Sequence, residues 1–195
     1  MIAIVDYGAG NISSVKKAFE HLGASVQVTA DPAVISAAEK LVVPGVGHFN
    51  RCEFLNQQLR MPVLDAARQG KPFLGICVGM QWLFAGSTEA PGTAGAALFA
   101  GECSRFPSEV KSPHVGWNQI DLREGSRLLR GIENGAFVYY THSYRAPIVA
   151  ETVATSSYGG TFSAGVERDN IFGVQFHPEK SGATGLRLLE NFCEL

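Results

Sequence analysis

A cysteine bracketed by two glycines is the residue best placed to do chemistry in this chain. Cys77 lies in the run Gly75-Ile-Cys-Val-Gly79, directly after the apolar segment Pro72–Ile76, which is typical of a buried strand. The glycines permit a sharp turn into a helix predicted for Met80–Phe84. A helix start offers free N–H groups and a positive dipole end, which favour a thiolate and a developing oxyanion. The pattern predicts a nucleophilic cysteine.

A histidine and a glutamate near the end of the chain supply the matching base. The predicted strand Ile171–Phe176 delivers His177 to its carboxyl end, and Glu179 follows two residues later. In extended geometry, side chains two residues apart point to the same side, so the carboxylate would hold one ring nitrogen of His177. We therefore predict that Cys77, His177 and Glu179 are the nucleophile, base and orienting carboxylate of a cysteine-based acyl transfer.

A glycine-rich loop is predicted to complete this site. Strand Leu41–Val43 is expected to end at the loop Pro44-Gly-Val-Gly47, whose backbone N–H groups would be free and approachable. Beside the cysteine, the loop residues Gly45 and Val46 would serve as oxyanion-hole donors together with the N–H of Val78.

Other chemistry is less well supported. The segment Asp6–Gly10 resembles the start of a dinucleotide fingerprint, but Ser13 occupies the third glycine position, so no nucleotide cofactor is expected. The other histidines lack metal-ligand spacing, and we expect no metal site: His21, His48, His114 and His142. The other cysteines are expected to be small apolar side chains: Cys52, Cys103 and Cys193.

The elements that must position these residues alternate in the first half of the chain. Strands are predicted at Ile2–Val5, Ser25–Thr29, Leu41–Val43 and Phe73–Ile76, and helices at Ile12–Leu22 and Phe54–Arg68, the latter interrupted at Pro62. This rhythm predicts an α/β fold of three layers, flavodoxin-like, with a mostly parallel central sheet.

Strands dominate the second half. They are predicted at Glu102–Phe106, Trp117–Leu122, Ala136–Tyr144, Glu151–Ser156, Phe162–Glu167 and Ile171–Phe176. A surface loop (Ala85–Ala97), a short helix (Ser126–Gly131) and a closing amphipathic helix (Thr184–Leu195) are also expected. We interpret the strands as an antiparallel extension of one mixed sheet.

Bulk composition narrows the class of protein. The 195 residues, 46% of them hydrophobic, are most simply one domain spanning 1–195 with a sizeable core. A net charge of −2 without basic runs disfavours nucleic acid or an anionic membrane as partner. The N-terminal apolar run is too short for a signal peptide, and no stretch has transmembrane length. Four cysteines without a Cys-x-x-Cys pair favour the reducing cytoplasm.

With these residues identified, the chain resembles the class I (triad) glutamine amidotransferases. Within that family it closely resembles the glutaminase subunits of imidazole glycerol phosphate synthase. The resemblance covers almost the whole chain. The motifs occur in the expected order: Asp6-Tyr-Gly-Ala-Gly-Asn11, Pro44-Gly-Val-Gly-His48, Gly75-Ile-Cys-Val-Gly-Met-Gln81, His114-Val-Gly-Trp-Asn118, His142-Ser-Tyr144 and Gly173-Val-Gln-Phe-His-Pro-Glu-Lys-Ser181. One departure is Val78, where such proteins often have leucine; the backbone N–H is unaffected.

The resemblance implies a reaction. Glutamine would be hydrolysed to glutamate and ammonia through a γ-glutamyl thioester at Cys77, without a cofactor. Four further residues would hold the amino-acid end of glutamine: Gly47, Gln81, Ser143 and Tyr144.

A partner is also implied. The motifs span 44–179, which leaves no room for a domain that consumes ammonia. The family supplies a (β/α)₈-barrel cyclase subunit, which makes imidazole glycerol phosphate and an aminoimidazole carboxamide ribotide (AICAR) in histidine biosynthesis. Four residues match positions that face this partner or the ammonia passage: Asn11, Trp117, Asn118 and Tyr139.

Two alternatives stay open at this point. The chain could be the glutaminase subunit of another synthase, such as the pyridoxal phosphate or anthranilate systems. It could instead be a non-catalytic flavodoxin-like binding protein with Cys77 as a redox sensor, although a sensor needs neither His177 nor the glycine-rich loop.

Overall fold

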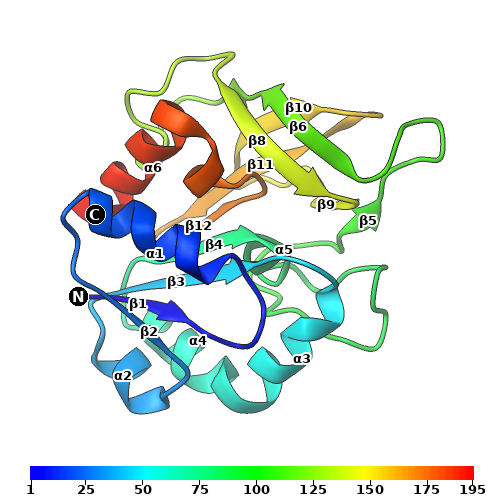
Figure 1. The fold of residues 1–195 in the computed structure, drawn as a ribbon. Helices are drawn as coiled ribbons and strands as arrows, with labels where there is room; N and C mark the ends of the chain where they lie inside the picture. Colours follow the sequence, from blue (N-terminus) through cyan, green and yellow to red (C-terminus); the bar gives the residue numbers. More distant parts are fainter.

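A mixed sheet of eight strands forms the centre of the molecule. The computed structural model describes residues 1–195 (Figure 1). The strands are β1 (Ile2–Val5), β2 (Val26–Thr29), β3 (Lys40–Gly45), β4 (Phe73–Cys77), β7 (Asp121–Leu122), β10 (Thr152–Ser157), β11 (Thr161–Arg168) and β12 (Ile171–Val174). They are ordered β2-β1-β3-β4-β12-β11-β10-β7. The first five run parallel, and β11, β10 and β7 continue the sheet antiparallel. The α/β prediction with a mixed sheet is confirmed.

Helices cover both faces of this sheet (Figure 1). The helices are α1 (Ile12–His21), α2 (Pro32–Ala37), α3 (Cys52–Phe54), α4 (Arg60–Arg68), α5 (Val78–Gln81) and α6 (Gly182–Glu194). On one face α1 packs on α6, where the rings of Phe19 and Phe192 lie 6.1 Å apart. On the other face α2 packs on α4. Burial of aromatic and aliphatic side chains between these layers provides the main stabilisation of the fold. None of the helices is long and apolar enough to cross a membrane.

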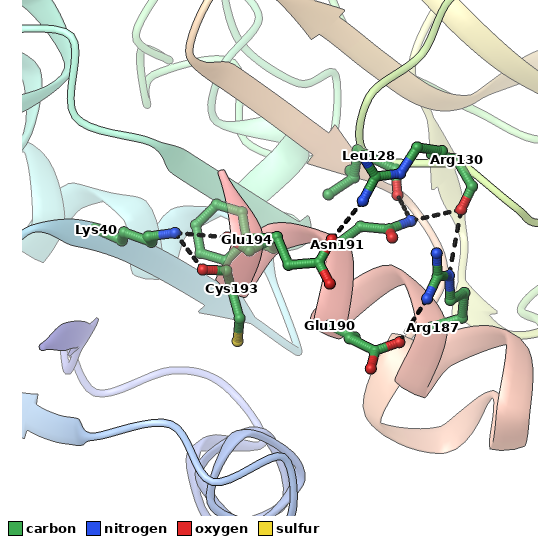
Figure 2. Close-up of polar contacts among 9 residues, drawn as sticks. Lys40, Leu128, Arg130, Arg187, Glu190, Asn191, Cys193 and Glu194 are labelled. Carbon is green, nitrogen blue, oxygen red and sulfur yellow. Dashed lines mark hydrogen bonds and ion pairs between the residues drawn. The ribbon is translucent and has the colours of Figure 1, made fainter.

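The closing helix is tied to β3 and to the 128–130 segment by hydrogen bonds to backbone carbonyls (Figure 2). Asn191 donates through Nδ2 to two carbonyls of the 128–130 segment, at 2.9 and 2.8 Å. Lys40, at the start of β3, donates to the carbonyls of Phe192 and Cys193, at 3.1 and 2.5 Å. The Lys40 bonds satisfy carbonyls that the C-terminal end of α6 leaves unpaired.

Two small sheets lie outside the main one, which corrects the prediction of a single extended sheet. β6 (His114–Gln119) pairs with β8 (Phe137–His142), and β5 (Ser104–Arg105) pairs with β9 (Tyr144–Arg145). The β6–β8 pair lies beside α6 (Figure 1). The predicted strand Trp117–Leu122 is divided between β6 and β7, and the predicted strand Ala136–Tyr144 between β8 and β9. Alternation along the chain could not determine these divisions or the strand partners, because pairing is a tertiary property.

The third strand is longer than predicted. β3 continues through Pro44 and Gly45, which pair with Ile76 and Cys77 of β4. Proline is tolerated here because the pairing of β1 with β3 ends at Val42, so the missing N–H removes no ladder bond. The loop predicted to start at Pro44 therefore begins only after Gly45.

Two helical predictions need correction. Pro62 lies in the first turn of α4 and does not interrupt the helix; the irregularity is a π-helical turn, Leu55–Leu59, one turn earlier. Helix α2 was not predicted, although Asp31 before Pro32 is a start signal. The Asp31 side chain accepts a hydrogen bond from the N–H of Ala33 at 2.8 Å.

Two connecting segments also differ from expectation. The short helix predicted at Ser126–Gly131 is a series of turns, whose free carbonyls are the ones that Asn191 binds. The Ala85–Ala97 loop is packed against the protein rather than loose on its surface. Ser87 is buried, and Arg60 donates to the carbonyl of Gly95 at 2.9 Å.

Candidate active site

Cys77 occupies a strained turn between β4 and α5. Its backbone has φ 54° and ψ −109°, a conformation that residues other than glycine rarely adopt. Such strain costs about 1–3 kcal/mol and persists only where the surrounding structure enforces it. The residue is 2% exposed and lines a cavity. The sharp turn inferred from the flanking glycines is present.

Close backbone packing explains why both flanking residues are glycine. A Cβ on Gly79 would lie 1.8 Å from the carbonyl oxygen of Val43, and one on Gly75 would lie 2.6 Å from the carbonyl oxygen of Gly79. The start of α5 is thus pressed onto β3 and β4, with no room for a side chain. This contact fixes the direction in which Cys77 leaves the sheet.

His177 and Glu179 meet as a buried pair. His177 Nδ1 lies 2.9 Å from Glu179 Oε1, and both side chains are 1% exposed. The strand ends at Val174 rather than Phe176, and Glu179 sits in the 3₁₀ turn Pro178–Lys180. The pairing therefore depends on this turn, not on the extended geometry that we predicted.

The free ring nitrogen of His177 is directed toward the nucleophile. Nε2 is buried and has no hydrogen-bond partner. Burial alone would lower the pKa of His177, but the negative charges and hydrogen bonds of Cys77 and Glu179 outweigh it and raise this pKa to about 10. The protonated imidazolium is therefore the dominant form of His177 at neutral pH. Sulfur, imidazole and carboxylate from distant parts of the sequence are together.

A cavity of about 230 Å³ opens beside the sulfur. Its lining residues are Gly47, Cys77, Val78, Gln81, Glu89, Pro113, Thr141, His142, Ser143 and Tyr144. All four residues that the resemblance assigned to glutamine binding are among them. Its polar lining suits a small polar molecule whose reacting group reaches Cys77.

The residues predicted to bind the oxyanion surround the start of α5. Gly45 is the β3 partner of Cys77, and a Cβ on it would lie 2.6 Å from Val78 Cβ. Val78 begins α5, so its N–H has no partner within the helix. Val46 lies between Gly45 and Gly47, and Gly47 has φ 92° at the cavity edge. The direction of the Val46 N–H as an oxyanion donor stays a prediction.

The four residues predicted to face a partner or the ammonia passage lie in different settings. Trp117 and Tyr139 pair across β6 and β8, with ring centroids 6.0 Å apart, and Trp117 is 55% exposed. Asn11 Nδ2 instead points to the active site, 3.5 Å from Glu179 Oε1. Asn118 Nδ2 donates to the carbonyl of Ser157 at 3.1 Å. Of these four residues only Trp117 is exposed, and the other three are half-buried.

Three residues near the cysteine were not singled out from the sequence. Glu89 brings a carboxylate to the cavity and accepts the N–H of Phe49 at 2.8 Å. Gln175 Nε2 lies 3.6 Å from Cys77 Sγ. His142 lines the cavity and contacts a second buried histidine, His114. The sequence offered one signal for Gln175. It lies two residues before His177, so in an extended segment its side chain points to the same side as that of His177.

The hydrogen bonds of the two buried histidines, His114 and His142, have a defined donor-to-acceptor direction. His142 Nδ1 lies 2.9 Å from the carbonyl of Tyr144, so this nitrogen carries the proton. Its Nε2 then accepts from His114 Nδ1 at 3.1 Å. Burial lowers the pKa of His114 to about 4 and that of His142 to about 3. Both rings are neutral at physiological pH.

Comparison with known proteins decides the family. Residues 3–195 match the family model described as glutamine amidotransferase class-I. The chain belongs to the class I glutamine amidotransferase family. It is 48% identical to imidazole glycerol phosphate synthase subunit HisH of Thermococcus kodakarensis, over 100% of both chains. It is 47% identical to the HisH subunit of Methanothermobacter thermautotrophicus, over 100% of this chain and 98% of that one. The resemblance noted from the motifs is confirmed, and the chain is an enzyme subunit.

Solved glutamine amidotransferases share the fold. A structure described as a glutamine amidotransferase superposes with a TM-score of 0.78 at 16% identity, covering 100% of this chain and 98% of that one. The PurLQS structure from Thermotoga maritima superposes with a TM-score of 0.76 at 20% identity, covering 99% and 97%. At such identities the likeness concerns the architecture alone.

Proposed function

We propose that this glutamine amidotransferase hydrolyses L-glutamine to glutamate and ammonia and is the glutaminase subunit of an imidazole glycerol phosphate synthase. The observation that carries the proposal is the buried set of Cys77, His177 and Glu179 beside a polar cavity, in a chain 48% identical to a HisH subunit over its whole length. That identity favours this synthase over the pyridoxal phosphate and anthranilate systems.

The cavity suits free glutamine. The carboxylate of Glu89 complements the α-ammonium group of an amino acid, while Gly47, Gln81, Ser143 and Tyr144 line the space for the amino-acid end of glutamine. The carboxamide then reaches the sulfur of Cys77.

The first half of the reaction forms a thioester. The Cys77 thiolate attacks the carboxamide carbon, and the carbonyl oxygen gains negative charge next to the N–H of Val78 and the 45–47 loop. As the tetrahedral intermediate collapses, the C–N bond breaks and the His177 imidazolium gives its proton to the leaving nitrogen. Ammonia leaves, and the γ-glutamyl group stays on sulfur.

The second half returns the enzyme to its starting state. His177, now neutral, takes a proton from water, whose oxygen attacks the thioester carbon. The C–S bond breaks, the electron pair returns to sulfur, and glutamate is released. Glu179 keeps the ring oriented through Nδ1 in both steps, so Nε2 always faces the reacting atoms.

An apolar face on the small sheet is the proposed docking surface for the cyclase. Residues of β6 and β8 that alternate outward include Val115, Trp117 and Phe137, exposed by 56%, 55% and 54%. Exposed apolar side chains gathered in this way commonly mark protein interfaces. Ammonia would pass from Cys77 to this (β/α)₈-barrel partner, and both would work in the cytoplasm, where a reducing environment keeps Cys77 a thiol.

The direct test is copurification of the chain with the cyclase, followed by measurement of glutamate release. We expect a stable complex and slow glutamate release by the chain alone. The rate should rise when the cyclase and its ribotide ligand are added, since the glycine-rich loop would then hold its N–H groups toward the oxyanion. Full turnover by the chain alone, unaffected by the cyclase, would contradict the coupling. Failure to release glutamate under any condition would contradict the activity.

A further inference from the structure

A buried glutamine contacts the nucleophile, and the reaction described above gives it no role. Gln175 follows β12, and its side chain is fully buried. Its Nε2 lies 3.6 Å from Cys77 Sγ, and its Oε1 lies 3.1 Å from Gln81 Nε2. Both polar ends of this amide are therefore occupied, one of them by the reacting sulfur.

The direction of the Gln175 amide follows from its neighbours. Gln81 Nε2 lies 2.9 Å from the carbonyl oxygen of Tyr144, which can only accept a hydrogen bond, so this end of Gln81 is the N–H₂ group. The Gln175 atom that faces it must then be the acceptor oxygen. The N–H₂ end of Gln175 consequently faces the sulfur. This orientation follows from the neighbouring groups and does not depend on which amide atom is first taken as nitrogen and which as oxygen.

Two groups lie within hydrogen-bond distance of the Cys77 sulfur, and they suit opposite protonation states of it. The carbonyl oxygen of Thr141, 3.9 Å from Sγ, can only accept, so it suits the thiol. The N–H of Gln175 can only donate, so it suits the thiolate. A hydrogen bond donated to the charged form of a group favours that form.

We propose that Gln175 is a catalytic residue whose side-chain amide stabilises the Cys77 thiolate, before attack on the substrate and again when the thioester is hydrolysed. Gln175 exchanges no atom or proton. Its N–H loses its charged partner when the S–C bond forms, and regains it when that bond breaks and the electron pair returns to sulfur. Gln81 supports this role by holding Gln175 Oε1, which ties the amide to the Tyr144 carbonyl at the cavity wall. The role in turnover rests on the proposed glutaminase activity.

The test is the pH dependence of Cys77 alkylation by iodoacetamide, followed by peptide mass spectrometry. This readout needs no glutamine, so it is independent of whether the chain hydrolyses glutamine. Gln175→Met keeps the length of the side chain and removes the donor. We expect its alkylation midpoint to move upward by about one pH unit, and alkylation at neutral pH to slow about tenfold. In the glutaminase assay kcat should fall with little change in KM, since the residue contacts sulfur and not substrate.

A second variant and a measurement on the unaltered protein keep the proposal falsifiable if Gln175→Met fails to fold. Gln175→Glu keeps an acceptor for Gln81 but places a carboxylate beside the sulfur, so its midpoint should move further upward. In the unaltered protein, the side-chain N–H signals of Gln175 in NMR should shift with the same midpoint as Cys77 alkylation. An unchanged midpoint in a folded variant would overturn the proposal. So would Gln175 signals that do not respond to pH through the Cys77 titration.

Discussion

The backbone N–H of His177 donates to the carbonyl of Tyr139 at 2.9 Å, which joins the triad directly to strand β8. The same residue is held a second time, since Ser181 Oγ accepts the N–H of Tyr139 at 2.9 Å. Tyr139 pairs with Trp117 on the exposed apolar face. A partner that shifts β8 would therefore move the base of the reaction by way of one hydrogen bond.

The first prediction concerns the exposed face. Trp117→Ala should weaken cyclase binding by about 2 kcal/mol, which is about 30-fold in Kd, because a large exposed aromatic side chain is a typical interface anchor. Glutamate release by the chain alone should not change. Met61→Ala is the matched control, since Met61 is 59% exposed and belongs to α4, a helix well apart from β6 and β8 (Figure 1). Titration calorimetry with the purified cyclase measures both. Equal Kd values for the two variants would exclude this face from the interface.

The second prediction separates the two reactions of the synthase. Cys77→Ala should abolish glutamine-dependent synthesis of imidazole glycerol phosphate but spare synthesis from added ammonium salt, because only ammonia production needs the sulfur. Cys193→Ala should affect neither reaction, as this cysteine lies at the end of α6. The measurement is product formation by the assembled complex with each nitrogen source. If Cys77→Ala loses both activities, the residue is needed for assembly rather than for chemistry.

The third prediction concerns packing behind the nucleophile. Gly79→Ala should lower the free energy of unfolding by about 1–3 kcal/mol, because its Cβ would lie 1.8 Å from the Val43 carbonyl oxygen and β3 would have to move. Gly92→Ala is the control. A Cβ at Gly92 meets nothing within 4 Å, so its effect should stay within about 0.5 kcal/mol. Urea denaturation of both variants measures the difference, and equal stabilities would show that α5 is not pressed onto β3.

The fourth prediction concerns acid stability. Burial holds the pKa of His114 at about 4 and that of His142 at about 3, whereas both are near 6.5 in the unfolded chain. Below pH 6.5 the unfolded chain takes up protons that the folded protein does not, so stability falls as the pH decreases toward 3. The slope is at most about 1.4 kcal/mol per pH unit for each histidine.

The matching experiment compares the unaltered protein with His114→Gln. Denaturant unfolding between pH 7 and 4 should give a shallower loss of stability in the variant, since one neutral buried imidazole has been removed. Carboxylates titrate in both proteins and cancel in the comparison. Parallel curves would mean that His114 is protonated in the folded state at these pH values.

The sequence predicted those parts of the fold and site that depend on local patterns. The Cys77 turn was predictable because two glycines, a buried strand and a helix start are adjacent in the chain. The parallel half of the sheet followed from alternating strands and helices. The separate pairing of β6 with β8 was not predictable, because alternation within Trp117–Leu122 does not specify which strand it joins.

Side-chain contacts across the sheet were the least predictable part of the site. Gln175 and Cys77 are 98 positions apart, and only the pairing of β12 with β4 brings them together. The Asn11 amide lies 3.5 Å from Glu179, because α1 begins beside the 3₁₀ turn that carries this carboxylate. Neither contact can be inferred from the spacing of the residues or from the composition of the chain.

The most direct measurement is mass spectrometry of the protein after treatment with a glutamine-mimicking electrophile. Cys77 should be labelled alone, and glutamine should slow the labelling. Burial raises the pKa of Cys52 to about 12 and also raises the pKa values of Cys103 and Cys193, so these thiols should stay unmodified. Labelling spread over all four cysteines, or labelling of Cys77 that glutamine does not slow, would contradict Cys77 as the nucleophile of a glutaminase.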